Sequence, residues 1–239
     1  MTENNAVSIV TLLTGKAVPL NDSGAISGID KHPCQAAQIV GHTGLQGDEQ
    51  GDLVRHGGPE KAVHHYPYEH YASWIDVCGE IPVLSRPGAF GENISTVGMT
   101  EHNCCVGDIY RVGTALLQIS QARQPCWKLN HRFGRNDMAA LVQKTRLTGW
   151  YYRVLETGLI AAGDCFLLED RPCPNWTLIK LLETLYGDAT RMHKPSLVGI
   201  ANLAPLSFSW RQLAQKRLER GAVEDWSPRL TGVESGAAG

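Results

Sequence analysis

The stretch Asp108-Ile-Tyr-Arg-Val112-Gly-Thr-Ala115-Leu-Leu-Gln-Ile-Ser120 carries the clearest strand signal in the chain. A Gly-Thr step separates two β-prone runs, which is the spacing of a tight hairpin. In the second run Ala115, Leu117 and Ile119 occupy alternate positions. Because successive side chains of a strand point to opposite faces, this alternation predicts an antiparallel pair with one face in a hydrophobic core.

Short β-like runs separated by Gly, Pro, Asn and Asp continue from residue 6 to about residue 171, for example at residues 7–13 and 37–40. A second pair of runs, at residues 150–155 and 159–168, is expected to turn at Gly158. Strands this apolar need protection at their edges, and closure of the sheet provides it. The pattern therefore predicts a β-barrel.

Helical signals interrupt and then follow this β-rich region. Residues 69–78 and 137–144 have apolar side chains three to four positions apart, which predicts two helical inserts. After Pro172, Asn175 is a candidate N-cap for a leucine stripe at helical spacing, and residues 207–220 predict a further helix. We expect an α+β protein, with a β-barrel-like domain at residues 1–171, a helical unit at 172–230 and a disordered tail at 231–239.

Composition narrows the class of partner and the compartment. The chain has 239 residues and a formal net charge of −2 without a basic block, which favours a small-molecule substrate over nucleic acid or a membrane surface. Its seven cysteines lack the C-x2-C spacing of zinc or iron–sulfur sites, and their odd number suits free thiols in a reducing cytoplasm. The polar opening lacks the layout of a secretion signal, so we expect a cytoplasmic protein.

The segment from Gln118 to His131 contains the cysteine with the strongest chemical signal. Cys126 follows the second strand of the hairpin and Pro125, and it is flanked by Arg123 and Lys128. Nearby positive charge favours the thiolate, which is both a nucleophile and a ligand for soft metals. Cys126 is therefore a candidate catalytic residue and metal ligand, although a buried structural thiol is an alternative interpretation.

Two further segments could contribute to a site. In the first, Gly57 and Gly58 follow His56, so that the loop can approach a ligand closely while Arg55 and Lys61 hold a phosphate; a solvated hairpin turn is the alternative. In the second, Glu92 and Asn93 could cap backbone groups or contact a polar heterocycle. The Walker spacing for nucleotide phosphates does not occur.

Histidines leave two other readings open. His64, His65 and His70 are near one another in sequence, yet adjacent residues of a strand point to opposite faces, which disfavours a shared metal site. Cys126 paired with His56 or His131 would also suit a nucleophilic hydrolase. Spacing alone does not separate these chemistries.

Taken together, the segments resemble the MOSC domain family, named for the C-terminal part of molybdenum cofactor sulfurases, and within it the bacterial YiiM-type group. The similarity runs from about Gly15 to Leu230 and comprises five blocks in the order typical of the family: G-L-Q-G-D-E-Q, H-G-G-P-E-K-A-V-H-H-Y-P, A-F-G-E-N-I-S-T, G-D-I-Y-R and Q-A-R-Q-P-C-W-K-L-N. The resemblance implies a β-barrel-like MOSC core followed by a C-terminal three-helix unit.

The resemblance also implies an activity. The cysteine typical of the family falls on Cys126, whose thiolate would ligate the molybdenum of a molybdopterin-type cofactor. The implied reaction reduces N-hydroxylated compounds, such as the base analogue 6-N-hydroxylaminopurine, and so detoxifies them, with electrons from an external flavin reductase. His56 or His131 could donate a proton. The candidate cofactor-binding residues are Asp48, Arg55, His56, Gly57, Gly58, Lys61, Glu92, Asn93, Arg123 and Lys128.

The chain departs from related amidoxime-reducing proteins, which have arginine and proline where this chain has Gly91 and Glu92. Their phosphate anchor cannot be transferred to this loop, so Arg123, Lys61 or Arg55 would replace it. Two alternatives stay open: a sulfur or cofactor carrier that uses a Cys126 persulfide, and a binding protein whose C-terminal helices recruit a partner. A homodimer is also left open.

Overall fold

The hairpin predicted at residues 108–120 is present as β9 (Ile109–Val112) and β10 (Ala115–Ala122). The two strands are antiparallel, with Ala115 opposite Val112. Ala115, Leu117 and Ile119 are all fully buried, which confirms the predicted core face. The computed structural model describes residues 6–20, 24–52, 56–188 and 192–232.

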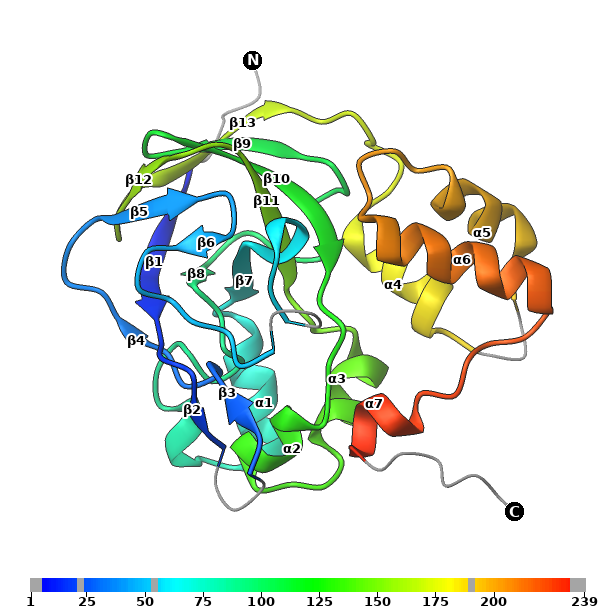
Figure 1. Ribbon diagram of the computed structural model, residues 1–239, viewed down its shortest axis with the longest axis horizontal. Helices are drawn as coiled ribbons and strands as arrows, with labels where there is room; N and C mark the ends of the chain where they lie inside the picture. Colours follow the sequence, from blue (N-terminus) through cyan, green and yellow to red (C-terminus); the bar gives the residue numbers. More distant parts are fainter. Residues whose placement is uncertain (1–5, 21–23, 53–55, 189–191, 233–239) are drawn as a thin grey trace.

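Seven of the described strands close into a barrel, in the order β13-β9-β10-β11-β7-β8-β1, because β1 pairs back onto β13 (Figure 1). The other barrel strands are β1 (Val7–Thr14), β7 (Val63–Pro67), β8 (Ile94–Thr96), β11 (Trp150–Glu156) and β13 (Cys165–Asp170). Neighbours are antiparallel except β7 and β8, which run parallel. The predicted barrel and the α+β class are confirmed.

The remaining described strands are short. They are β2 (Val18–Pro19), β3 (Ile26–Ser27), β4 (His32–Pro33), β5 (Gln38–Gly41), β6 (Gly44–Leu45) and β12 (Gly158–Ile160). Of these, β4 pairs with β1 of the barrel, β12, β5 and β6 form a separate three-stranded sheet, and β2 and β3 form a two-stranded one. The predicted hairpin at Gly158 is wrong, because β11 pairs with β10 and β7, whereas β12 pairs with β5 and β13 pairs with β9 and β1. A turn from Ala161 to Asp164, in which the Ala161 N–H donates to the Asp164 carboxylate over 2.8 Å, splits the later run into two strands.

Three helices cover one end of the barrel: α1 (His70–Cys78), α2 (Lys128–Phe133) and α3 (Met138–Thr145). Two 3-10 turns, η2 (Pro59–Lys61) and η3 (Pro82–Leu84), lie in the connecting loops. A second hydrophobic core forms where α1, α2 and α3 meet the Phe90 ring, which stacks on Tyr66 of β7 at 4.0 Å. Both predicted inserts, α1 and α3, are confirmed, while the six-residue α2 was too short to give a periodic signal.

The C-terminal part contains α4 (Leu178–Tyr186), α5 (Lys194–Ala201), α6 (Phe208–Arg220) and α7 (Ser227–Thr231). The predicted leucine stripe is buried in α4 and shares one hydrophobic core with the barrel. The helix is capped by Thr177 and not by Asn175, since the Thr177 hydroxyl accepts from the Lys180 N–H. Helix α7 leaves the other three and lies beside α2 and α3 (Figure 1).

A disordered tail is predicted for residues 231–239. Thr231 is instead the last residue of α7, and residues 233–239 lie outside the described residues. None of the described helices is long and apolar enough to cross a bilayer.

A histidine lies in the barrel interior. His65 is fully buried and exchanges hydrogen bonds with the Tyr152 hydroxyl at 2.9 Å and the Thr96 hydroxyl at 2.8 Å. Its ring packs 4.3 Å from that of Trp150. Burial lowers the pKa of His65 to about 3, so the folded protein keeps this imidazole neutral at physiological pH.

We predict that His65 makes the fold sensitive to acid. Below a pH of about 6.5 the unfolded chain takes up a proton at this histidine and the folded chain does not. The free energy of unfolding therefore falls as the pH falls toward 3, with His65 contributing about 2–3 kcal/mol of loss by pH ~4.5. Denaturant titrations across this range should show a shallower dependence on pH for His65→Gln, whereas His102→Gln, at an exposed position, should keep the wild-type slope. Equal slopes for all three proteins would contradict this explanation.

Candidate functional site

Cys126 lies in the loop between β10 and α2 and lines a cleft. The loop begins at Arg123, whose N–H donates to the Gly149 carbonyl at 3.0 Å, and the Cys126 carbonyl accepts from the Leu129 N–H in the first turn of α2. The thiol is therefore half-buried between an extended segment and a helix, with one side open to the cleft.

The cleft contains about 550 Å³ of empty space, part of it open to solvent. Six chain segments meet there. The residues that line it are Ser27, Gly28, Ile29, Lys31, Gln50, Gly51, His56, Lys61, His64, Phe90, Gly91, Asn93, Arg123, Cys126, Lys128 and Tyr151. Six of the candidates predicted from the sequence are thus brought together: His56, Lys61, Asn93, Arg123, Cys126 and Lys128.

The His56 imidazole is in polar contact with the thiol. Its Nε2 lies 3.4 Å from the Cys126 sulfur. Burial, followed by the positive charge of Lys128, lowers the pKa of His56 to about 4. The imidazole is therefore neutral at physiological pH, and it can donate an N–H to the sulfur or accept a proton from it.

Four cationic side chains line the same cleft: Lys31, Lys61, Arg123 and Lys128. Lys31, Arg123 and Lys128 are each less than a tenth exposed. Burial lowers the pKa of Lys31, and the negative charge of Asp48 offsets part of this shift. Burial also lowers the pKa of Lys61, and Asp52 and Cys126 offset part of that shift. Buried cations are costly without counter-charge, so this arrangement favours an anionic ligand.

Two nitrogen atoms on nearly fully buried side chains of the cleft have no hydrogen-bond partner within the described residues. They are Nη1 of Arg123 and Nε2 of His64. Each belongs to a side chain that is at least nine-tenths buried, and both side chains line the cleft. Because buried polar atoms are normally hydrogen-bonded, these atoms are suited to contacts with a bound polar molecule.

The Asp48 carboxylate pairs with Lys31, one of the four cations that line the cleft. It is fully buried and also accepts from the Gly15 N–H at 2.8 Å and the Asn93 amide at 2.9 Å. Asn93 in turn accepts from the His64 N–H at 3.0 Å. Asp48 was predicted to contact the cofactor, but it is not among the described residues that line this cleft. Its carboxylate holds Lys31 and Asn93 in place.

Glu92 has a comparable internal role. It accepts from the Gly88 N–H at 2.7 Å, the Phe90 N–H at 3.0 Å and the Tyr71 hydroxyl at 2.5 Å. The side chain is fully buried and is not among the described residues that line the cleft. Glu92 therefore shapes the loop that presents Phe90 and Gly91, which corresponds to the capping alternative considered for this residue.

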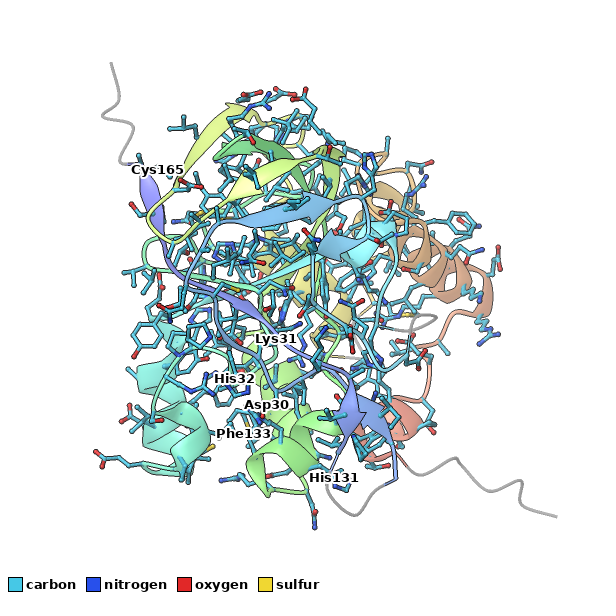
Figure 2. All side chains as sticks on the ribbon, turned by 60° about the vertical axis from the view of Figure 1, so that its left-hand side comes forward. Asp30, Lys31, His32, His131, Phe133 and Cys165 are labelled. Atoms are coloured by element: carbon cyan, nitrogen blue, oxygen red, sulfur yellow. The ribbon has the colours of Figure 1, made fainter. Side chains whose placement is uncertain are left out.

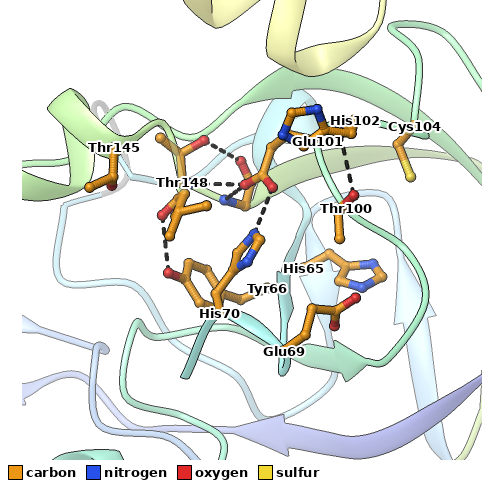
Figure 3. A network of polar contacts seen from close by, with 12 residues as sticks. His65, Tyr66, Glu69, His70, Thr100, Glu101, His102, Cys104, Thr145 and Thr148 are labelled. Carbon is orange, nitrogen blue, oxygen red and sulfur yellow. Dashed lines mark hydrogen bonds and ion pairs between the residues drawn. The ribbon is translucent and has the colours of Figure 1, made fainter. Parts of the chain in front are cut away.

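A third buried carboxylate, Glu101, fixes the turn before β11 (Figure 3). It accepts from the backbone N–H groups of Thr148 and Gly149 at 2.9 and 2.7 Å, and from His70 Nε2 at 2.7 Å. Since the Gly149 carbonyl receives the Arg123 N–H, this network sets where the cysteine loop starts.

Several predicted residues lie elsewhere. Gly57 and Gly58 form the turn before η2 and are not among the described residues that line the cleft. Arg55 lies outside the described residues. His131 is exposed on α2 with its ring edge-on to Trp127 at 5.3 Å, and it is not among the described residues that line the cleft. Figure 2 shows it at the margin of the molecule, with Lys31 further inside.

Ten of the sixteen lining residues were not predicted as cofactor contacts, among them Lys31, Tyr151 and His64. Lys31 lies in a loop without any motif, and Tyr151 lies on β11, far along the chain from the other blocks. His64 faces the cleft and stacks on the Tyr151 ring at 4.7 Å, whereas its neighbour His65 faces the barrel interior. The sequence predicted that the two histidines face opposite sides, but not that His64 is the one that faces the cleft.

Comparison with known proteins assigns the chain to a protein family. The family model described as MOSC domain matches residues 52–166. The chain belongs to the MOSC domain family.

Within that family it is similar to the YiiM proteins. It is 38% identical over 227 residues to Protein YiiM of Escherichia coli, which covers 93% of this chain and 98% of that protein. The crystal structure of E. coli YiiM superposes with a TM-score of 0.79, covering 94% of this chain and 98% of that one at 33% identity. A Gibberella moniliformis protein named Reductase is 37% identical over 177 residues, which is 74% of this chain and 31% of that protein.

We predict that Asp48 is among the most destabilising positions to truncate. Asp48→Ala leaves the buried Lys31 cation without its partner, which should lower the free energy of unfolding by about 3–5 kcal/mol in a denaturant titration. Glu49→Ala provides a matched control, because Glu49 pairs with Lys16 on the surface, and its loss should be much smaller. Similar losses in both variants would show that the buried pair does not hold the cleft wall.

Proposed function

We propose that the protein is an oxidoreductase that binds a molybdopterin-type molybdenum cofactor through Cys126 and reduces N-hydroxylated compounds. The observation that carries the proposal is a half-buried thiol inside a cleft lined by four cations, one of which, Arg123, keeps a buried donor without a described partner. The MOSC family and the similarity to a fungal protein named Reductase support an oxidoreductase.

An anionic cofactor that carries a soft metal fits these groups. A cysteine thiolate is a soft ligand. Among the described residues, no group of three or more His, Cys, Asp or Glu side chains is placed to hold a metal ion. One protein thiolate suffices where the cofactor itself supplies further sulfur ligands, as a pterin dithiolene does. Cys126 would hold the metal, and Arg123 with Lys61 and Lys128 would hold the phosphate.

When bound, the cofactor supplies two electrons for cleavage of the substrate's N–O bond. The balanced reaction converts R–NHOH, two protons and two electrons into R–NH₂ and water. The chain must therefore provide protons close to the reacting oxygen. His56 is positioned for this, since its Nε2 is beside the Cys126 sulfur.

The charge state of His56 couples this proton to occupancy of the cleft. Its pKa is about 4 partly because Lys128, Lys61 and Arg123 are close by. An anion bound to those cations offsets their charge, which raises the His56 pKa toward its ordinary value. We propose that His56 then holds a proton at Nε2 and passes it to the departing oxygen.

The apolar and aromatic residues of the cleft suit a flat heteroaromatic substrate. Ile29, Phe90 and Tyr151 are among the lining residues; Phe90 is nearly fully buried and stacks on Tyr66, whereas the half-buried Tyr151 ring is stacked on His64 with an interplanar angle of 28°. Aromatic faces of this kind stack favourably on planar rings. These residues support N-hydroxylated base analogues such as 6-N-hydroxylaminopurine as the substrate class, and their detoxification as the role.

Electrons are proposed to come from a separate flavin reductase. The seven cysteines of this chain do not have the spacing of an iron–sulfur site, and a bound pterin–molybdenum centre has to be re-reduced after each turnover. A docked reductase would deliver electrons at the open side of the cleft.

The experiment is turnover of 6-N-hydroxylaminopurine by protein loaded in a cofactor-producing host, with a reduced viologen as artificial electron donor. We expect one amine product per two electrons consumed. Cys126→Ala should lower kcat/KM by roughly a hundredfold or more, because it removes a direct metal ligand. Cys165→Ser is the matched control, since Cys165 lies at the far margin of the molecule from Lys31 (Figure 2), and it should keep wild-type turnover.

Absence of turnover with every N-hydroxylated base tested, in protein shown to contain molybdenum, would overturn the proposed reaction. A persulfide on Cys126 after treatment with a polysulfide, which transfers a sulfane sulfur to the thiolate and leaves as the shortened polysulfide, would then favour the carrier alternative.

A further inference from the structure

The last helix, α7, packs against the loop that carries Cys126, although the two are about a hundred residues apart in the chain (Figure 1). The Arg229 guanidinium donates through Nη1 to the Pro125 carbonyl. The Arg229 backbone carbonyl accepts from the Trp127 N–H at 2.8 Å. These two groups immediately precede and follow Cys126, so a single residue of α7 holds both neighbours of the thiol.

Further contacts fix α7 in this position. The Leu230 carbonyl accepts from the Asn130 amide at 2.8 Å, which ties α7 to α2. Nη2 of Arg229 donates to the side-chain oxygen of Gln143, a buried residue of α3. Gly232 ends the helix at a φ of 76°, and a Cβ there would lie only 2.9 Å from Cγ of the Trp127 ring.

The approach of α7 is set by the helical unit. Arg217 of α6 pairs with Glu224 at 2.7 Å and donates to the Leu185 carbonyl of α4 at 2.7 Å. Glu224 also accepts from the Trp226 indole N–H at 2.8 Å. The segment that leads into α7 is thus anchored on α4 and α6, and the Arg229 guanidinium lies 5.6 Å from the centre of the Tyr186 ring.

We propose that α7 is a clamp on the Cys126 loop and that Arg229 is a positioning residue for the thiol. Pro125 has no N–H, so the loop has one donor fewer with which to hold itself. Charge-assisted hydrogen bonds from Arg229 compensate for this loss by fixing the preceding carbonyl. The catalytic consequence rests on the proposed function, since a metal ligand must be held within a fraction of an ångström.

The test measures alkylation of Cys126 by iodoacetamide in cofactor-free protein, read out peptide by peptide by mass spectrometry. Arg229→Ala should raise the Cys126 rate by roughly threefold or more, because its two side-chain hydrogen bonds are lost, while buried Cys104 and half-buried Cys34 keep their rates. Arg229→Lys should restore part of the wild-type rate, since an ammonium can still donate to the Pro125 carbonyl. Arg220→Ala removes an exposed arginine from the end of α6 and should change nothing.

An unchanged Cys126 rate in folded Arg229→Ala would overturn the proposal. If that variant is destabilised and all cysteines react faster, Gly232→Ala decides, because it leaves Arg229 in place and adds a methyl group against Trp127. A selective increase at Cys126 supports the clamp, and no selective change overturns it. Because no cofactor is present, this result is independent of whether the proposed reductase activity is found.

Discussion

The cleft depends on the ion pair and hydrogen bonds made by the buried carboxylate of Asp48. This carboxylate pairs with Lys31 and also fixes Asn93, which bridges to β7 through the His64 N–H and to β1 through the Leu13 carbonyl. One anion therefore holds a buried cation, a loop and two barrel strands in register. Removing it would leave charge and hydrogen-bond donors in the interior without partners, which is far more costly than losing a surface ion pair.

This constraint produces a cleft whose electrostatic potential favours anions before any ligand arrives. Lys31, Arg123 and Lys128 are already desolvated, and the barrel and its covering helices keep them close to Cys126. Burial, with a further contribution from these positive charges, lowers the pKa of His56 to about 4 and keeps the imidazole neutral beside the sulfur. An anion bound to these cations would offset the part of this lowering that the cations cause.

The sequence predicted the barrel through local alternation at Ala115, Leu117 and Ile119, and it placed Cys126, Arg123 and Lys128 in one site because they lie within a few residues of each other. It failed where long-range contacts decide. The split of the run at residues 159–168 depends on a turn at Asp164. The internal hydrogen bonds of Asp48 and Glu92, two predicted cofactor-binding residues, likewise depend on partners far away in the chain. Lys31 and the clamp of Arg229 arise from segments that meet only in three dimensions, so no local pattern marks them.

The most direct measurement for the central claim is X-ray absorption at the molybdenum edge, on wild-type protein and on Cys126→Ser loaded in the same host. The account predicts that the wild-type metal has one more sulfur neighbour than the two of a pterin dithiolene, and that this neighbour disappears in the variant. An equal number of sulfur neighbours in both proteins would contradict ligation by Cys126.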